Sequence, residues 1–308
     1  MSVASNSGNV GAAAGGPPVC CEDTRFTTSS SLLGPGVVRG LRLWRTHYRE
    51  IITKRSDDII IVSYPKSGRT WQRVMLCHYI NSVYLDQEAR SLNINTLTRR
   101  AGLPRISYSH NGSNLRHALP VGHWMVGDPL IWWGRKIILL LRDPRDLLVS
   151  AYMHAINRSN TFRGSLSQFI RHPCMGIEKV LTTYQRWDAR KSLASSVLVQ
   201  TYEMMHYQPQ AALREVLGFA GIPVDIRAVE NAAEFARFEN LKAKEREGYF
   251  IGKAMRSGRG GEAGMKIRSG KVGGFADHMR GEDLDYIRSA ALRIGAPIEW
   301  PGLSGERP

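Results

Sequence analysis

Residues 59–71 read IIIVSYPKSGRTW, and this stretch decides the fold. The run Ile59–Val62 is short, β-branched and apolar on both faces, which predicts a buried strand of a parallel sheet. Pro65 ends the strand, and a helix is expected from Ser67 to about Val83. The turn between them gathers backbone N–H groups and a helix dipole beside a lysine and two hydroxyls, which predicts an anion site. The spacing is not that of a Walker A loop, because the lysine precedes the single glycine. A strand-to-helix connection with an incidental lysine is the alternative.

Two further apolar runs, Ile137–Leu141 and Val197–Thr201, are each followed by a segment of helical period, at about 143–157 and about 203–219. A weaker strand is expected at Arg105–Ser109. Strands that alternate with helices predict an α/β fold, a three-layer sandwich with a central parallel β-sheet. Ligands of such sheets bind at the carboxyl ends of the strands.

The second strong run leads into the sequence RDPRDLLVSAY, which starts at Arg142. Asp143 suits a helix N-cap, and Pro144 suits the first helical turn. Ser150 then lies about two turns into the helix. The arginine and the hydroxyl are therefore candidates to hold one phosphate from two sides. A structural salt bridge from Arg142 to Asp143 or Asp146 is the alternative.

The composition is that of a folded, strongly basic protein. Of the 308 residues, 42 are Lys or Arg and 27 are Asp or Glu, a formal net charge of +15, and 43% are hydrophobic. This hydrophobic content excludes a wholly disordered chain. The charge predicts an anionic partner: nucleic acid, acidic lipid or a small polyphosphorylated ligand. The four cysteines suit neither a disulfide framework nor a CxxC metal site. No stretch of about 18 apolar residues and no secretory signal is apparent, so we expect a cytoplasmic protein without membrane association.

Two segments differ from the rest in composition. Residues 1–30 are rich in Gly, Ala, Ser and Pro without a period, which predicts a disordered N-terminal tail before a single domain at 31–308. Residues 242–274 are expected to form a basic, Gly-rich loop, with nine Lys or Arg between Lys242 and Lys271. Such a loop suits a lid over phosphate groups, and a solvated surface loop is the alternative.

Three segments together identify a family. The loop from Tyr64 to Trp71, YPKSGRTW, resembles the YPKSGTTW loop of the sulfotransferases that use 3′-phosphoadenosine 5′-phosphosulfate (PAPS). RDPRDLLVSAY resembles their second signature, and residues 268–275, RSGKVGGF, resemble their R-K-G-x-x-G-x-W segment. The order and spacing agree over roughly residues 38–290. The resemblance implies PAPS as co-substrate and 3′-phosphoadenosine 5′-phosphate (PAP) as product. We expect no metal, because the sequence has no DxD motif or His/Cys cluster to hold one and the chemistry does not need one.

The resemblance also implies roles for individual residues. Lys66 would contact the 5′-phosphosulfate, and the 3′-phosphate would be held by Arg142, Ser150, Arg268 and the following Ser269 and Gly270. The other implied donor contacts are those of the loop, Ser67, Gly68, Arg69 and Thr70, and those of the nucleotide pocket, Trp71, Tyr202 and Phe238. Trp71 would stack on adenine. Core packing is the alternative for Tyr202 and Phe238.

The sequence departs from the family pattern at three of these positions. Arg69 replaces a threonine of the loop, so it either adds a charge near the donor or points outward. Phe275 stands where Trp is usual. Ala236 replaces a threonine that hydrogen-bonds adenine in the family, which puts that contact in doubt.

His110 is the candidate catalytic base. The family carries a K-T-H element after a strand, and Tyr108, Ser109 and His110 match it with tyrosine in place of lysine. Imidazole accepts a proton at neutral pH, so His110 suits removal of a proton from an acceptor. His117 and His123 are the alternatives, and each of the three could also be ordinary surface histidine.

The predicted function is sulfuryl transfer from PAPS to a hydroxyl or amine of a small molecule, such as a natural product, phenol, steroid or saccharide. The alternatives are a P-loop-type nucleotide kinase or NTPase, which would need a Walker lysine and a Mg²⁺-binding acid, and a non-catalytic nucleic-acid-binding protein, which would explain the charge. The tryptophans at 124, 132 and 133 are expected in the core rather than against the acceptor. The sequence does not predict an oligomeric state.

Overall fold

The computed structural model describes residues 54, 56–88, 90–113, 129–251, 255, 265–267 and 270–296. Contacts within the chain separate residues 1–31 from residues 32–308, and every element described below belongs to the second unit. The predicted N-terminal tail at 1–30 lies outside the described residues.

A four-stranded parallel sheet forms the centre of this unit. Its strands are β1 (Ile59–Ser63), β2 (Ile106–Ser109), β3 (Lys136–Leu141) and β4 (Ser196–Thr201), in the order β2-β1-β3-β4. All five residues of β1 are buried, as its apolar run predicts, because this strand has a neighbour on each side and helices over both faces. The three strong runs and the weaker one are therefore confirmed as strands.

The helix that follows each major strand carries the site. Helix α2 (Arg69–Ile80) follows β1, and α4 (Pro144–Asn157) follows β3. After β4 the expected helix at about 203–219 is wrong as a single element, because α7 (Tyr202–Tyr207) and α8 (Pro209–Ala220) are separate. Pro209 occupies the first position of α8, where its missing N–H costs nothing, but it cannot continue α7.

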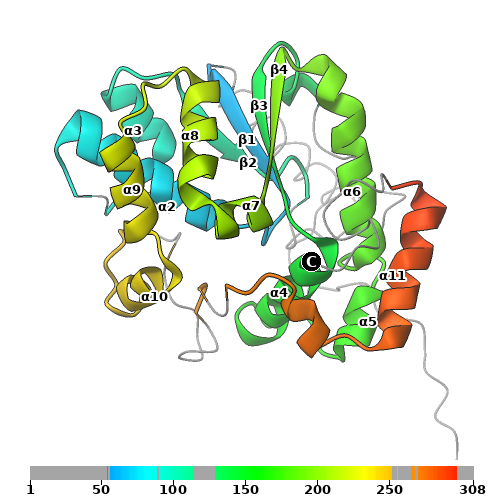
Figure 1. Ribbon diagram of the computed structural model, residues 1–308. Helices are drawn as coiled ribbons and strands as arrows, with labels where there is room; N and C mark the ends of the chain where they lie inside the picture. The colour runs from blue at the N-terminus through cyan, green and yellow to red at the C-terminus, as the bar shows by residue number, and fades with distance from the viewer. Residues whose placement is uncertain are drawn as a thin grey trace, which may run out of the picture. The chain divides into compact units, whose positions relative to one another are not determined.

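The remaining helices complete two layers on the sheet (Figure 1). One layer contains α2, α8 and α9 with α3, and the other contains α4, α5, α6 and α11. This is the predicted three-layer α/β sandwich. The elements not yet given are α3 (Ile94–Arg100), α5 (Leu166–Ile170), α6 (Ile177–Arg190), α9 (Ile226–Phe235), α10 (Phe238–Arg246), α11 (Gly281–Ile294), a π-helical turn at Asn81–Leu85, and 3-10 turns at Pro129–Ile131, Lys191–Leu193 and Gly274–Asp277.

The tryptophans divide between core and surface. Trp132 is fully buried, as expected, whereas Trp133 is 69% exposed, so its predicted burial is wrong. The two neighbours follow the turn at Pro129–Ile131, and their side chains have opposite environments. Trp124 lies outside the described residues. No helix within the described ranges is long and apolar enough to cross a bilayer.

Candidate functional site

One cavity of about 480 Å³ collects the predicted residues at the carboxyl ends of the strands. This is where a doubly wound sheet binds ligands. The predicted residues that line the cavity are Lys66, Gly68, Arg69, Thr70, Trp71, His110, Arg142, Ser150, Tyr202, Phe238 and Gly270. Ser67 is not among the lining residues, because it is fully buried beneath the turn. Arg268, Ser269, His117 and His123 lie outside the described residues.

The turn between β1 and α2 is held in an unusual backbone conformation. Lys66 has φ 79° and Gly68 has φ 88°, both in the left-handed region. A Cβ on Gly68 would lie 2.6 Å from Cδ2 of Tyr202, so only glycine fits there. Lysine pays a strain penalty for the same region, and such strain is concentrated at ligand-binding sites. The turn therefore brings the Lys66 side chain to the cavity at the N-terminus of α2.

Arg142, at the end of β3, joins three parts of the cavity wall. Its Nη1 donates to the carbonyl oxygen of Lys66 (3.1 Å) and its Nη2 to that of Lys271 (3.3 Å). Its guanidinium carbon lies 4.0 Å from the centre of the Tyr202 ring, a cation–π contact. The buried Nε has no hydrogen-bond partner. The arginine is thus positioned by backbone carbonyls and retains a donor for a ligand.

Both interpretations of the second motif hold in part. Arg142 contacts Asp146, with 3.8 Å between Nη2 and Oδ2, as the salt-bridge alternative predicts. Asp143 is not the partner of Arg142. Its carboxylate caps α4 at the backbone N–H of Arg145 and pairs with the Arg145 guanidinium, with 2.7 Å between Oδ2 and Nη2. The N-cap expected at Asp143 is confirmed. The salt bridge orients the arginine, which still lines the cavity with Ser150.

Asp146 has a role that sequence reasoning missed. Its Oδ2 accepts from the backbone N–H of Gly273 and its Oδ1 from that of Phe275, both at 2.8 Å. Burial raises the pKa of this carboxyl, although Arg142 and the two N–H groups act in the opposite direction. The carboxylate therefore fixes the segment 270–275 to α4. The spacing of four from Arg142 was visible, but its partners lie far along the chain.

An aromatic wall lies beside the turn and the segment that Asp146 holds. Trp71 and Tyr202 meet edge to face with 5.7 Å between ring centres, and Phe238 also lines the cavity. The Tyr202 hydroxyl donates to the Gly270 carbonyl at 3.0 Å. Gly270 has φ 64°, and a Cβ there would lie 2.5 Å from Cδ2 of Phe238. These rings offer faces and edges on which a planar base can stack.

Position 236, where the family has a threonine, offers no hydroxyl to a ligand. Ala236 lines the cavity next to this wall and is fully buried, so no hydroxyl reaches a base from that position. His206 was missed by sequence reasoning and also lines the cavity, with its ring 6.3 Å from Tyr202 and 6.2 Å from Trp71.

His110 follows β2 and lines the cavity. Its Nδ1 lies 2.8 Å from the carbonyl oxygen of Ser63, the last residue of β1. A carbonyl only accepts, so Nδ1 carries the proton in the neutral ring and Nε2 keeps its lone pair. Burial, followed by the positive charge of Arg69, lowers the pKa of His110 well below its usual value. The imidazole is therefore neutral at physiological pH.

Arg69 lines the cavity, so the alternative in which it points outward is wrong. Its guanidinium carbon lies 5.9 Å from the centre of the Tyr108 ring, and that of Arg73 lies 4.4 Å from the same ring. Tyr108, which stands where the family has lysine, donates its hydroxyl to Oε1 of Gln72. The basic charge at this end of the cavity therefore comes from α2 instead of from position 108.

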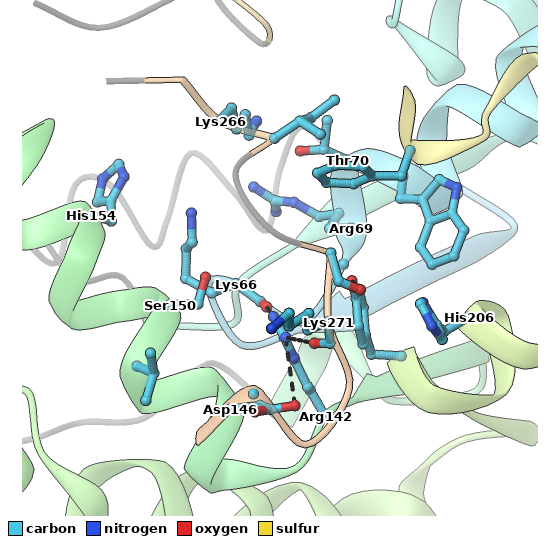
Figure 2. A pocket seen from close by; sticks show the side chains of 18 of the residues that line it. Lys66, Arg69, Thr70, Arg142, Asp146, Ser150, His154, His206, Lys266 and Lys271 are labelled. Atoms are coloured by element: carbon cyan, nitrogen blue, oxygen red, sulfur yellow. Dashed lines mark hydrogen bonds and ion pairs between the residues drawn. The ribbon is translucent and has the colours of Figure 1, made fainter. Parts of the chain in front are cut away.

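One face of α4 supplies a row of cavity residues. Asp146, Ser150 and His154 of α4 and the C-cap residue Arg158 are spaced by four, and all of them line the cavity. Figure 2 shows the first three. Because side chains four apart lie on one helix face, this row could have been read from the predicted helix. Only Ser150 was identified as a site residue in the sequence.

Lys266 also lines the cavity, and sequence reasoning did not single it out. The buried carboxylate of Glu245 accepts from the backbone N–H groups of Lys266 (2.7 Å) and Ile267 (2.9 Å). Glu245 belongs to α10, which ends at Arg246. The loop predicted at 242–274 is therefore wrong over residues 242–246, which are helical. Burial and then the neighbouring Lys66 lower the pKa of Lys266 to about 7.

Comparison with known proteins identifies the family. Residues 56–291 match the family model of the sulfotransferase domain. The amine sulfotransferase of Oryctolagus cuniculus is 23% identical over 242 residues, which cover 75% of this chain and 78% of the relative. Cytosolic sulfotransferase 16 of Arabidopsis thaliana is 23% identical over 271 residues, 77% of this chain and 75% of the relative.

A solved structure shares the fold. The crystal structure of retinol dehydratase in complex with androsterone and inactive cofactor PAP superposes with a TM-score of 0.54 at 16% identity, and the match covers 82% of each chain. At this identity the likeness supports the fold alone. The family model spans all four strands and the cavity residues, from β1 to α11. This chain therefore belongs to the sulfotransferase domain family.

Proposed function

We propose that this protein transfers the sulfuryl group of PAPS to a hydroxyl or amine of a small-molecule acceptor. Membership in the family supports a sulfotransferase activity. The observation that carries the finer proposal is that one cavity joins the Lys66 turn, the Arg142 guanidinium, the aromatic wall and the neutral imidazole of His110. A nucleotide with two anionic ends, a planar base and a reacting centre would need each of these.

The cavity fits the donor in charge and in shape. Arg142 has a buried Nε without a hydrogen-bond partner, and Ser150 adds a hydroxyl from α4, so the pair suits the 3′-phosphate. Trp71, Tyr202 and Phe238 suit the adenine. Lys66 and Thr70 suit the 5′-phosphosulfate at the start of α2. Arg268 and Ser269 remain predictions of the same kind.

Lys66 would act on the leaving phosphate. Sulfuryl transfer, like phosphoryl transfer, passes an electron-poor group in line between two oxygens, so the protein mainly positions the reactants and stabilises charge. Negative charge grows on the 5′-phosphate as the sulfur–oxygen bond breaks, and the Lys66 ammonium would neutralise it. The bond from Arg142 to the Lys66 carbonyl keeps the turn in place while this happens.

His110 would accept the proton of the attacking hydroxyl or amine at Nε2. The Ser63 carbonyl fixes the ring and its tautomer by binding Nδ1–H. The lowered pKa of His110 keeps the ring unprotonated before attack. After transfer, the proton resides on Nε2 until it passes to solvent or to product.

Two of the similar proteins support a small-molecule acceptor. One relative is named an amine sulfotransferase, and one similar structure is a complex with androsterone. The cytosolic relative supports a cytoplasmic location.

The test is transfer of label from ³⁵S-PAPS to a chemically diverse panel of phenols, alcohols, amines and saccharides, together with calorimetric titration of PAP. We expect tight PAP binding and label on at least one acceptor. Mg²⁺-dependent hydrolysis of ATP without label transfer would overturn the proposal in favour of a nucleotide kinase or NTPase.

A further inference from the structure

Two arginines of α2 lie over the ring of Tyr108. The guanidinium carbon of Arg73 lies 4.4 Å from the ring centre, and that of Arg69, one turn earlier in the helix, lies 5.9 Å from it. The face of an aromatic ring attracts a cation, so the ring can hold both guanidinium groups beside β2. A lysine at position 108, where the family pattern has it, would instead add a third cation to the two arginines.

The Tyr108 ring is itself fixed by a chain of hydrogen bonds. Its hydroxyl donates to Oε1 of Gln72 (3.3 Å), and Nε2 of Gln72 donates to Oε1 of Gln200 (2.6 Å). Nε2 of Gln200 donates in turn to the carbonyl oxygen of Ala212 (2.8 Å). Both glutamines are buried, and the chain connects β2 with α2, β4 and α8. The ring is therefore a fixed support for the arginines that lie over it.

Of the two arginines, Arg69 is the one that reaches the cavity. It lines the cavity together with Lys66 and His110, whereas Arg73 does not. Figure 2 shows the Arg69 side chain directed from the start of α2 into this space. Its charge also contributes, after burial, to the lowered pKa of His110, as expected of a guanidinium near the imidazole. Arg69 therefore faces the part of the cavity that contains the proposed base.

The start of α2 is an unfavourable place for an arginine. Arg69 is the first residue of the helix, and a cation at that position opposes the helix dipole. The first turn contains no acidic side chain, and the N-cap residue Gly68 has no side chain to bind the free N–H groups. A bound anion would offset this cost.

The 5′ end of the donor has two anionic groups. Lys66 is assigned above to the phosphate, and a guanidinium can bind two oxygens of a sulfate through parallel N–H groups. We propose, on the basis of the function proposed above, that Arg69 binds the oxygens of the sulfuryl group and that the Tyr108 ring positions its guanidinium for this contact.

The contact orients the sulfur for transfer. The bond from sulfur to the 5′-phosphate oxygen breaks, and its electron pair leaves with that oxygen. The acceptor oxygen or nitrogen forms the new bond to sulfur and gives its proton to His110. The sulfuryl oxygens stay on sulfur throughout, so Arg69 can hold them until the group departs. PAP lacks the sulfuryl group, and Arg69 therefore distinguishes the donor from its product.

Binding of PAPS and PAP in the absence of acceptor tests the proposal by calorimetry. Arg69→Met removes the charge and keeps a residue of similar helix propensity. We expect PAPS affinity to fall by about tenfold, as for the loss of a hydrogen bond between charged groups, and PAP affinity to change by less than about threefold. Arg227→Met is the matched control, because Arg227 is an exposed arginine in the first turn of α9 outside the cavity. It should keep both affinities.

Two variants of Tyr108 test its positioning role. Tyr108→Phe keeps the face of the ring and should keep the ratio of PAPS to PAP affinity. Tyr108→Leu removes the ring, and its ratio should fall toward that of Arg69→Met. In the double variant the ratio should be no lower than in Arg69→Met alone, because the ring acts through the arginine. PAP binding shows that each variant is folded.

A ratio in Arg69→Met equal to that of the wild type would overturn the contact with the sulfuryl group. An unchanged ratio in Tyr108→Leu, or an equal fall in Tyr108→Phe and Tyr108→Leu, would overturn the role of the ring. These results are distinct from failure of the proposed function, in which the wild-type protein would bind neither nucleotide.

Discussion

Arg142 donates from Nη1 to the backbone carbonyl of Lys66, with 3.1 Å between nitrogen and oxygen. The bond connects two of the motifs found in the sequence, which are 76 positions apart in the chain. Lys66 has φ 79°, so its carbonyl faces Arg142 only while the turn stays in the left-handed region. The guanidinium therefore fixes the turn through its backbone, while the Lys66 side chain lines the cavity.

Lys66→Ala removes the ammonium and keeps the carbonyl that Arg142 binds. We expect kcat to fall by about 10²–10³, the usual cost of losing one group that stabilises transition-state charge. The melting temperature should stay near that of the wild type, because the backbone bond persists. Initial rates with ³⁵S-PAPS and thermal unfolding measure the two effects. Lys191→Ala, which removes a half-buried pair with Asp188 outside the cavity, is the control and should keep full activity. Wild-type turnover in Lys66→Ala would refute the role of this lysine.

Gly270→Ala tests the close approach between the glycine and the aromatic wall. The new Cβ would lie 2.5 Å from Phe238, so the ring must move and the adenine site must change. We expect PAP affinity to fall by at least about tenfold, measured by calorimetry. Gly248→Ala is the matched control, because Gly248 has φ +65° against +64° for Gly270 and a Cβ there meets nothing within 4 Å. Alanine at either position has about the same backbone strain energy, about 1 kcal/mol. Equal PAP affinity in the two variants would show that the contact with Phe238 is unimportant.

The sequence predicted the sheet and many of the residues that line the cavity, because both depend on local patterns. A short β-branched run such as Ile59–Val62 favours a strand through its own residues, and the residues that follow such strands meet at one edge of a parallel sheet. Contacts between distant segments have no such local signal. Asp146 and Gly273 are 127 positions apart, and nothing near either residue predicts their bond.

Of three other features that differ from the expectations, one has a local signal in the sequence and two do not. Pro209 was a readable break in the expected helix at about 203–219. Lys266 was one of nine basic residues in a stretch without a period, and what distinguishes it is the clamp on its backbone by Glu245, a contact made only in the folded chain. Trp133 is exposed although its neighbour Trp132 is buried, and the composition of the segment does not separate them.

Asp146→Asn tests the carboxylate that holds the segment 270–275. An asparagine side chain offers one acceptor oxygen, so its amide N–H₂ would face one of the two backbone N–H groups, of Gly273 or Phe275. We expect a loss of about 1–3 kcal/mol in the free energy of unfolding, the cost of a buried donor left without a partner. PAP affinity should fall as well, because Gly270 lies in the same segment. Urea unfolding and calorimetry measure the two quantities, with the exposed Asp285→Asn as control. An unchanged unfolding curve would contradict this role.

The pH dependence of kcat/KM should identify His110 as the base. Its pKa is lowered well below 6.5, and only the unprotonated ring can accept a proton. As pH falls, activity should therefore persist through pH 6.5 and disappear only when the ring gains a proton at lower pH. His110→Ala should lose this acidic limb together with most of kcat. His172→Gln, outside the cavity, should keep the wild-type profile. Retention of most of kcat in His110→Ala would move the base to another residue.

The lowered pKa of Lys266, about 7 against an ordinary 10.5, links both stability and donor affinity to pH. Between these two values the unfolded chain binds a proton that the folded chain does not, so the wild type should gain stability relative to Lys266→Met as pH rises from about 7 to 9. An anion in the cavity favours the charged amine and raises its pKa, so PAP binding near pH 8 should take up a proton. Calorimetry in two buffers of different ionisation enthalpy measures that uptake. It should be absent in Lys266→Met, and equal uptake by both proteins would assign the proton to another group.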